Sequence, residues 1–235
     1  DTCGIIEFIF MLMGTGYMLS YNALITPIDY YSNEYPHYSS DIMYYIVPIH
    51  RAFLFLSLLL MLTPCFTYNN NHVQHHGNIQ ASSKSSNNSR ISWHLLITIP
   101  FMVIFMALSM YPFFPQYIKT IDQSIYFMIL LIICSFCGFF AGIIQTAITS
   151  FCNYLPSRYM KASISGQAMA GIIVCVIKII TKCINESNYK FTGKIYFVIG
   201  GLFNALCAIL FIGANNTKFV RYYMDKSLNS KNEKT

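Results

Sequence analysis

Charged side chains are scarce in this sequence. They make up 10% of its 235 residues, while 55% of the residues are hydrophobic, and an ordinary soluble domain has about 25% charged residues. This composition excludes a water-soluble globular protein. The excess of 15 lysines and arginines over 9 aspartates and glutamates gives a net charge of +6. The basic residues form no block of the kind that follows a phosphate backbone, which argues against a nucleic-acid partner.

The cysteines are few, and the apolar runs contain no combination of residues typical of a catalytic site. The 8 cysteines are too few for a disulfide scaffold, and several fall inside apolar runs, where they serve as small hydrophobic residues: Cys134, Cys137, Cys175 and Cys207. The serines and threonines of those runs have no histidine and aspartate partners. We therefore expect no enzyme and no cofactor.

One histidine cluster requires a separate interpretation. His72, His75 and His76 have the H-x-x-H-H spacing of one histidine box of membrane di-iron desaturases. Such enzymes need several boxes, whereas this chain has 6 histidines in total. Because the cluster lies in a polar tract rich in asparagine and serine, we interpret it as solvent-exposed and expect no metal site.

Long hydrophobic runs are the main feature that is present. Each has about 20 residues, the length at which a helix crosses roughly 30 Å of hydrocarbon. They cover approximately residues 5–25, 42–62, 93–113, 125–151, 162–180 and 195–212. The sequence therefore predicts an all-α, polytopic transmembrane helix bundle over residues 1–216, with a flexible cytoplasmic loop at 67–92 and a basic cytoplasmic tail at 217–235.

The distribution of basic residues predicts the orientation in the membrane. With a cytoplasmic N-terminus, the inner connections and tail hold Lys84, Arg90, Arg158, Lys161, Lys218, Arg221, Lys226, Lys231 and Lys234. The outer connections then hold only Lys119, Lys182, Lys190 and Lys194. Since cytoplasmic loops carry the excess of lysine and arginine, we expect both termini in the cytoplasm.

Small and polar residues form stripes on the fourth and fifth runs. The fourth run carries Gly138, Gly142, Gln145 and Thr149 on one helix face, and the fifth carries Ala162, Gly166 and Ala170 with Ser163, Gln167 and Gly171 alongside. Such stripes either allow close helix packing or line a cavity. We expect packing between the fourth and fifth helices at Gly166, while Gln167 can bond either a helix partner or a nucleobase edge.

Two further positions combine polarity with an aromatic ring. In the first run, Met18, Tyr21 and Asn22 offer a flat ring that can stack on a base beside an amide that can read its edge. The alternative is that Tyr21 lies in the interfacial aromatic belt. Arg51 lies deep in the second run, after Pro48 and His50, which indicates either a watery vestibule or a shortened helix.

Three sequence motifs together resemble the equilibrative nucleoside transporter family. The run Gly14-Thr15-Gly16-Tyr17-Met18-Leu19-Ser20-Tyr21-Asn22 resembles the family's G-x-G-x-x-x-P-W-N, with Ser20 and Tyr21 in place of proline and tryptophan. Gln145, then Leu155-Pro156-Ser157-Arg158-Tyr159, then Ser165-Gly166-Gln167 with Ala170-Gly171 resemble its Q, F/L-P-x-x-Y and S-G-Q-x-x-A-G elements. The abundance of Asn, Ile, Tyr and Lys is similar to that in transporters of apicomplexan parasites.

This resemblance implies a fold and a site. The family has eleven helices arranged as six plus five, so the chain corresponds to a major-facilitator-like N-terminal half that lacks the C-terminal helical half. The substrate lies between the halves, with the base bonded by Gln145 and enclosed by Met18, Tyr21 and Asn22, while an aspartate and an arginine come from the second half.

The implied protein is a multi-pass carrier of the plasma membrane that moves purine or pyrimidine nucleosides or nucleobases by alternating access. Facilitated diffusion is favoured because Glu7 is the sole carboxylate in the predicted spans. The competing interpretation is a structural or regulatory membrane subunit that does not transport.

Overall fold

A computed structural model describes residues 4–38, 41–62, 81–113, 123–184, 189–220 and 222–223. All regular structure in these residues is helical, and they contain no strand. The helices are α1 (Ile5–Ile25), α2 (Ile28–Glu34), α3 (Ile42–Leu62), α5 (Ala81–Met110), α7 (Gln123–Cys152), α8 (Ser157–Ile184) and α9 (Tyr189–Asn215), with the short 3-10 turns η1 (Pro36–Tyr38) and η3 (Tyr111–Phe113).

The prediction of a polytopic helical bundle is confirmed. The structure has 6 helices long and apolar enough to cross a membrane, and each predicted apolar run falls on one of them. The predicted loop 67–92 is wrong over its second part, because α5 already begins at Ala81. Adding turns to an existing helix needs no new nucleus, so the polar segment continues the apolar span. Residues 63–80, with the histidine cluster, lie outside the described residues.

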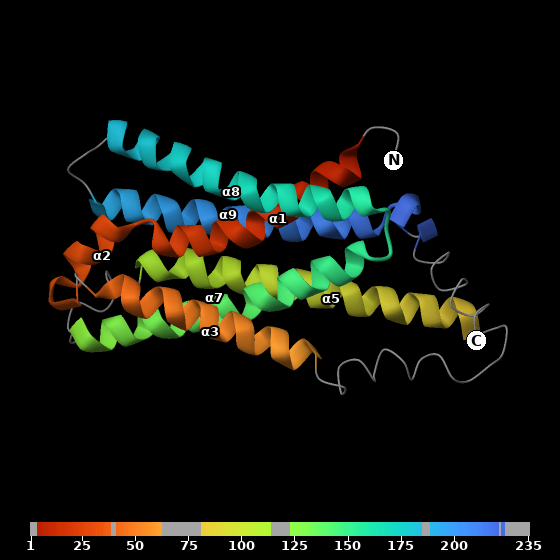
Figure 1. The fold of residues 1–235 in the computed structure, drawn as a ribbon, viewed down its shortest axis with the longest axis horizontal. Coiled ribbons are helices and arrows are strands. Elements are labelled where there is room, and N and C mark those ends of the chain that lie inside the picture. Colours follow the sequence, from red (N-terminus) through yellow and green to blue (C-terminus); the bar gives the residue numbers. More distant parts are fainter. Residues whose placement is uncertain are drawn as a thin grey trace.

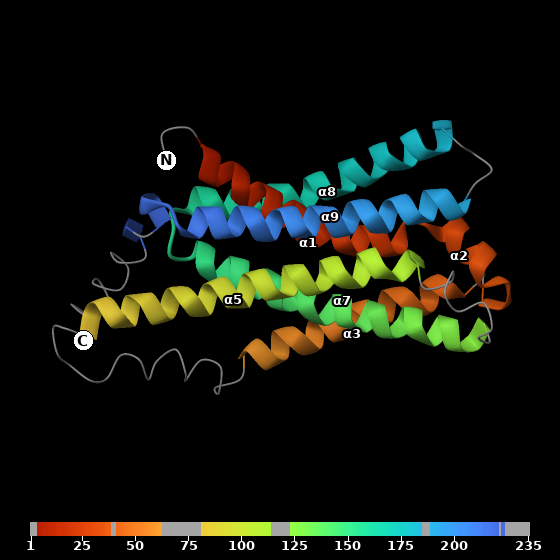
Figure 2. The same cartoon turned by 180° about the vertical axis from the view of Figure 1, so that it is seen from behind.

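The six spans form two layers that lie side by side (Figures 1 and 2). One layer contains α1, α8 and α9, and the other contains α3, α5 and α7. The most extensive contacts join α1 to α8 and α9, α7 to α3 and α5, and α5 to α9. Figure 1 shows α8 and α3 toward the viewer, while Figure 2 shows α9 and α5 on the opposite face.

Glycines set the closest helix contacts, and the pairing differs from the one expected. A Cβ on Gly166 would meet the carbonyl oxygen of Met11, and a Cβ on Gly14 would meet that of Ser163. The expected packing between the fourth and fifth helices is therefore wrong, since α8 packs on α1. On α7, Gly138 faces the His50 carbonyl and Gly142 faces Ser57, so α7 uses its glycines to approach α3.

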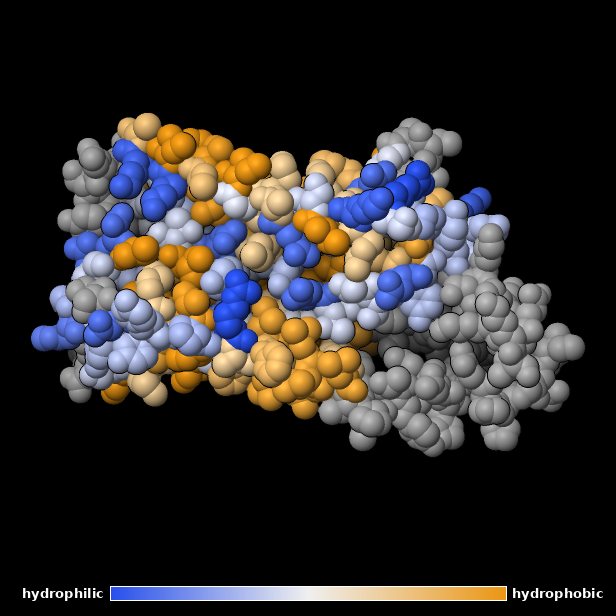
Figure 3. Space-filling model, in the orientation of Figure 1, coloured by the Kyte–Doolittle hydropathy of each residue, from blue (hydrophilic) through white to orange (hydrophobic). Residues whose placement is uncertain are grey.

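The outer surface of the bundle is apolar. Large hydrophobic side chains are exposed on every span, for example Phe8, Phe55, Met102, Ile132, Ile172 and Ile209. Figure 3 shows apolar surfaces on α8 and α3, with polar residues between them on the face toward the viewer. A bilayer covers such surfaces, so they are typical of a membrane protein.

Aromatic residues fill both ends of the core. At one end, α2 and η1 bring Tyr31 and Tyr35 against Phe197 and Tyr111. The Tyr31 hydroxyl donates to the Leu24 carbonyl at 2.7 Å, and burial raises the pKa of Tyr31, which keeps this donor protonated. At the other end, Phe10 stacks on Phe151 and contacts Tyr159 edge-on.

Candidate functional site

A polar contact between the two layers involves the predicted base-binding glutamine. The Tyr17 hydroxyl of α1 donates to Gln145 Oε1 of α7 at 2.8 Å. Tyr17 is buried and Gln145 is partly buried. The acceptor of the Gln145 amide is thus engaged within the protein, whereas its NH2 donors have no partner among the described residues. The amide bonds across to another helix, and it still presents donors at the edge of the core.

Next to this pair, Tyr21 is enclosed by residues of α3. Its ring centroid lies 4.7 Å from that of His50, with an interplanar angle of 43°. The Arg51 guanidinium carbon lies over the same ring, 4.2 Å from its centroid. Tyr21 is only 9% exposed. The alternative of an interfacial belt residue is therefore wrong, because the ring packs between α1 and α3.

Arg51 belongs to a continuous helix. Of the two alternatives for the second span, the shortened helix is wrong, since α3 runs from Ile42 to Leu62 with Pro48 inside it. Pro48 is the seventh residue of α3, past the first turn, so the Tyr44 carbonyl lacks its usual N–H donor while the helix continues to Leu62. Arg51 is exposed and lies about 13 Å along the helix from Ile42 at 1.5 Å per residue, near the middle of a bilayer. The described residues offer it no carboxylate partner.

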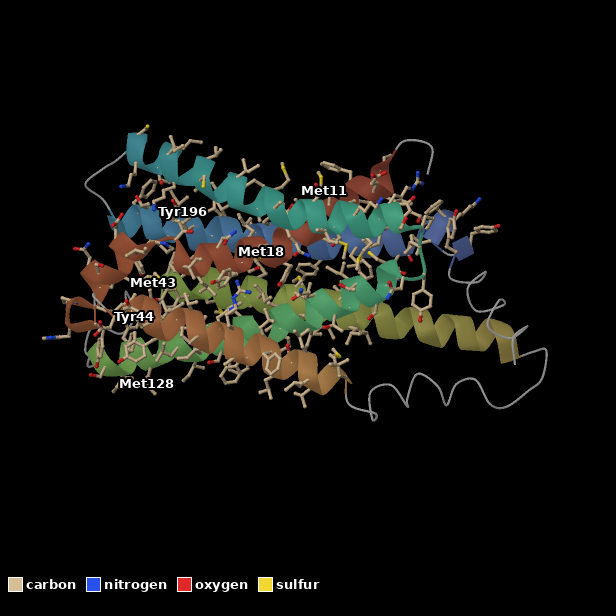
Figure 4. All side chains as sticks on the ribbon, viewed as in Figure 1. Met11, Met18, Met43, Tyr44, Met128 and Tyr196 are labelled. Carbon is tan, nitrogen blue, oxygen red and sulfur yellow. The ribbon has the colours of Figure 1, made fainter. Side chains whose placement is uncertain are left out.

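The other predicted substrate contacts, Met18 and Asn22, are partly buried. Met18 packs against both hydrophobic clusters of the core and lies about midway along the bundle, between α8 and α3 (Figure 4). The Asn22 carbonyl accepts a bond from Thr26 Oγ1 at 2.6 Å. The structure therefore brings Gln145 together with Tyr17, and Tyr21 together with Arg51, along one side of α1.

The predicted packing residues fall into two groups. Gly138, Gly142, Gly166 and Ala170 are buried, and Thr15 Oγ1 donates to the Gly166 carbonyl at 2.9 Å. Gly171 is exposed, and a Cβ there would have nothing within 4 Å, so the described helices give it no packing partner. Gln167 is partly buried, and no hydrogen bond of its side chain occurs in the described part of the chain.

Two buried polar residues, Asn204 and His50, were not predicted to face the core. Ser20 Oγ contacts the Asn204 amide oxygen at 3.0 Å, and Asn204 Nδ2 donates to the Gly200 carbonyl at 2.6 Å. His50 is 1% exposed, and neither of its ring nitrogens has a hydrogen-bond partner. An amide or imidazole inside an apolar run normally faces the bundle interior, and that signal was available for both residues.

One small cavity of the described residues has a lining that includes neither Tyr21 nor Gln145. This cavity of about 40 Å³, lined by Thr26, Lys178 and Tyr196 among others, lies between α8, α9 and the start of α2. Within the described ranges, no group of three His, Cys, Asp or Glu side chains could hold a metal ion. Within the cluster around Tyr21 and Gln145, only Arg51 is exposed, while Gln145 is partly buried and Tyr21 is buried.

The sequence matches known proteins along most of its length. The family model "Nucleoside transporter" matches residues 131–235. Equilibrative nucleotide transporter 1 of Arabidopsis thaliana is 21% identical over 223 residues, covering 93% of this chain and 44% of the relative. Equilibrative nucleoside transporter 4 is 25% identical over 220 residues in Danio rerio and 22% identical over 225 residues in Homo sapiens.

These matches make the chain similar to equilibrative nucleoside and nucleotide transporters. This confirms the resemblance drawn from the three motifs. Equilibrative nucleoside transporters are a family of transporters and not of enzymes, so the histidine-box interpretation is set aside. The two transporter 4 alignments include 93% and 96% of this chain, but only 37% and 38% of the relatives. It spans less than half of the relatives that it matches.

Proposed function

We propose that this chain forms the first helical half of an equilibrative transporter that moves nucleosides or nucleobases across a membrane. The observation that carries the proposal is the polar cluster where α1 meets α3 and α7. It combines the Gln145 amide, whose NH2 group can bond the edge of a base, with the exposed Arg51 guanidinium, which packs on the Tyr21 ring.

The exposed Arg51 and the partly buried Gln145 support a substrate site shared with a second helical half. A bundle with exposed polar groups needs a partner that covers them inside the membrane, because uncovered polar groups are costly in hydrocarbon. Transporters of this architecture bind near the midplane and rock one bundle against the other. We place the carrier in the plasma membrane and expect alternating access around Gln145, Tyr21, Met18 and Asn22.

Facilitated diffusion follows from the distribution of carboxylates. Among the six spans of the structure, the sole acidic residue is Glu7, in the first turn of α1. Proton-coupled carriers generally hold ionisable relays inside the membrane. On this half of the site, therefore, no acidic relay accompanies the base-binding cluster.

Replacing Gln145 by alanine in the full-length protein tests the proposal. One lost hydrogen bond is worth about 0.5–1.5 kcal/mol, and more where a partner stays unsatisfied, so nucleoside uptake is expected to fall several-fold at unchanged surface expression. Tyr17→Phe keeps the amide and removes only the bond that orients it, so a smaller decrease is expected. Uptake by Gln145→Ala equal to that of the wild type would remove Gln145 from the site.

A further inference from the structure

The groups around Tyr21 offer hydrogen-bond donors and almost no acceptors. Gln145 uses its amide oxygen to accept from Tyr17 at 2.8 Å, which leaves its NH2 group for another partner. Arg51 carries five N–H donors and no acceptor. Within the described residues, neither the Gln145 NH2 group nor the Arg51 guanidinium has a hydrogen-bond partner.

Among the described residues, no carboxylate forms an ion pair with Arg51 or bonds the Gln145 NH2 group. Glu7 is the sole acidic residue of the described spans and comes ten residues before Tyr17 on α1, about 15 Å away at 1.5 Å per residue. His50, which also faces Tyr21, is 1% exposed and has both ring nitrogens enclosed. The exposed Arg51 guanidinium is therefore available to an acceptor from outside the described residues.

The position of Arg51 over Tyr21 suits a base as that acceptor. Its guanidinium carbon lies 4.2 Å from the ring centroid, and the side chain is exposed. The N–H groups of a guanidinium lie in its plane, so they stay available at its edge when the plane covers an aromatic ring. An arginine edge pairs with the O6 and N7 acceptors of a 6-oxopurine, whereas the N6 amino group of adenine is a donor.

Building on the proposed transport function, we infer that Arg51 is a specificity-determining residue that selects 6-oxopurine nucleosides and bases over 6-aminopurines. Arg51 supplies two donors to O6 and N7. The Gln145 NH2 group adds a donor to a further acceptor of the base. Adenosine places its own donor against these donors and is rejected.

Inosine and adenosine test this selectivity, because their bases differ only at position 6 and at the adjacent N1, which carries a hydrogen in hypoxanthine and is an acceptor in adenine. In the full-length protein, the wild type is expected to transport inosine with a Vmax/KM at least about tenfold higher than adenosine, as a bidentate pair discriminates between bases. Arg51→Gln is expected to reverse the preference, because glutamine pairs with N6 and N7 of adenine. Arg51→Lys keeps the positive charge but lacks the paired, coplanar N–H donors of a guanidinium. It is expected to reduce the inosine preference to near unity.

Lys178→Gln provides the matched control. It removes one positive charge from an exposed position on α8, away from Tyr21, and is expected to leave the inosine-to-adenosine ratio unchanged. An Arg51→Gln protein with the wild-type ratio would overturn the inference, as would a wild type without a preference. Inhibition by IMP and AMP alike, with none by inosine, would also overturn it, because the acceptor would then be phosphate.

Thermal stabilisation of the purified protein separates this inference from the proposed function. Stabilisation requires binding and not transport. Stronger stabilisation by inosine than by adenosine, lost in Arg51→Gln, supports the specificity role even if vesicles show no uptake, and the absence of uptake would then refute transport alone. Equal stabilisation by the two nucleosides refutes the specificity role.

Discussion

Replacing Gly166 by leucine is expected to remove most of the folded protein. A Cβ at this position already meets the carbonyl oxygen of Met11 and lies 3.0 Å from the Thr15 nitrogen. Overpacking costs about 1–3 kcal/mol where side chains can move aside, and here the obstacles are main-chain atoms of α1. The contact is reciprocal, because Gly14 of α1 is equally close to the Ser163 carbonyl of α8.

The measurement is the yield of monodisperse protein by fluorescence-detected size exclusion. Gly171→Leu makes the same change five residues later on α8, at an exposed position with nothing within 4 Å of the added Cβ, and should leave the yield close to that of the wild type. Normal yield of Gly166→Leu together with an altered substrate preference would mean that this stripe faces the transport cavity instead of α1.

The second large effect concerns the 235-residue chain expressed alone. We expect it to insert with both termini cytoplasmic, because each span bonds its own backbone and the lysine and arginine bias orients it. We expect it to give no nucleoside exchange, since alternating access needs a second bundle to rock against the first. The exposed Arg51 and the partly buried Gln145 would then lack the second half that covers them.

Tag accessibility in sealed vesicles measures the topology, and radiolabelled nucleoside uptake into proteoliposomes measures transport against the full-length protein. Saturable uptake by the 235-residue chain alone would contradict the expectation. A dimer of identical halves would then become the leading explanation, and crosslinking of the chain to a second copy would test it.

Helix positions could be predicted from the sequence because they depend on local properties. A run such as Ile42–Leu62 holds enough apolar residues to span a bilayer, and the structure gives the same bounds. The start of α5 at Ala81 could not be predicted, since the polar segment before the apolar span has no hydrophobic periodicity. The polar segment is helical because it continues the neighbouring apolar span, and not because its own residues favour a helix.

Contact partners were the harder part of the prediction. Spacing puts Gly166 on a helix face, but it does not say whether that face meets α7 or α1, because the choice depends on a matching gap at Gly14. Similarly, the contact of Arg51 with Tyr21 joins residues of different helices and rests on the crossing of α1 and α3. The family motifs drew attention to Tyr21 and Gln145, whereas His50 and Asn204 lay outside every motif.

Counterflow with the full-length protein tests the central claim most directly. Proteoliposomes are preloaded with unlabelled inosine and diluted into trace radiolabelled inosine without any ion gradient. An equilibrative nucleoside carrier with its base site at Gln145 and Tyr21 predicts a transient accumulation of label above equilibrium, which Gln145→Ala strongly reduces. Label that enters only under an imposed proton gradient, or no accumulation with inosine, adenosine or their bases, would contradict the account.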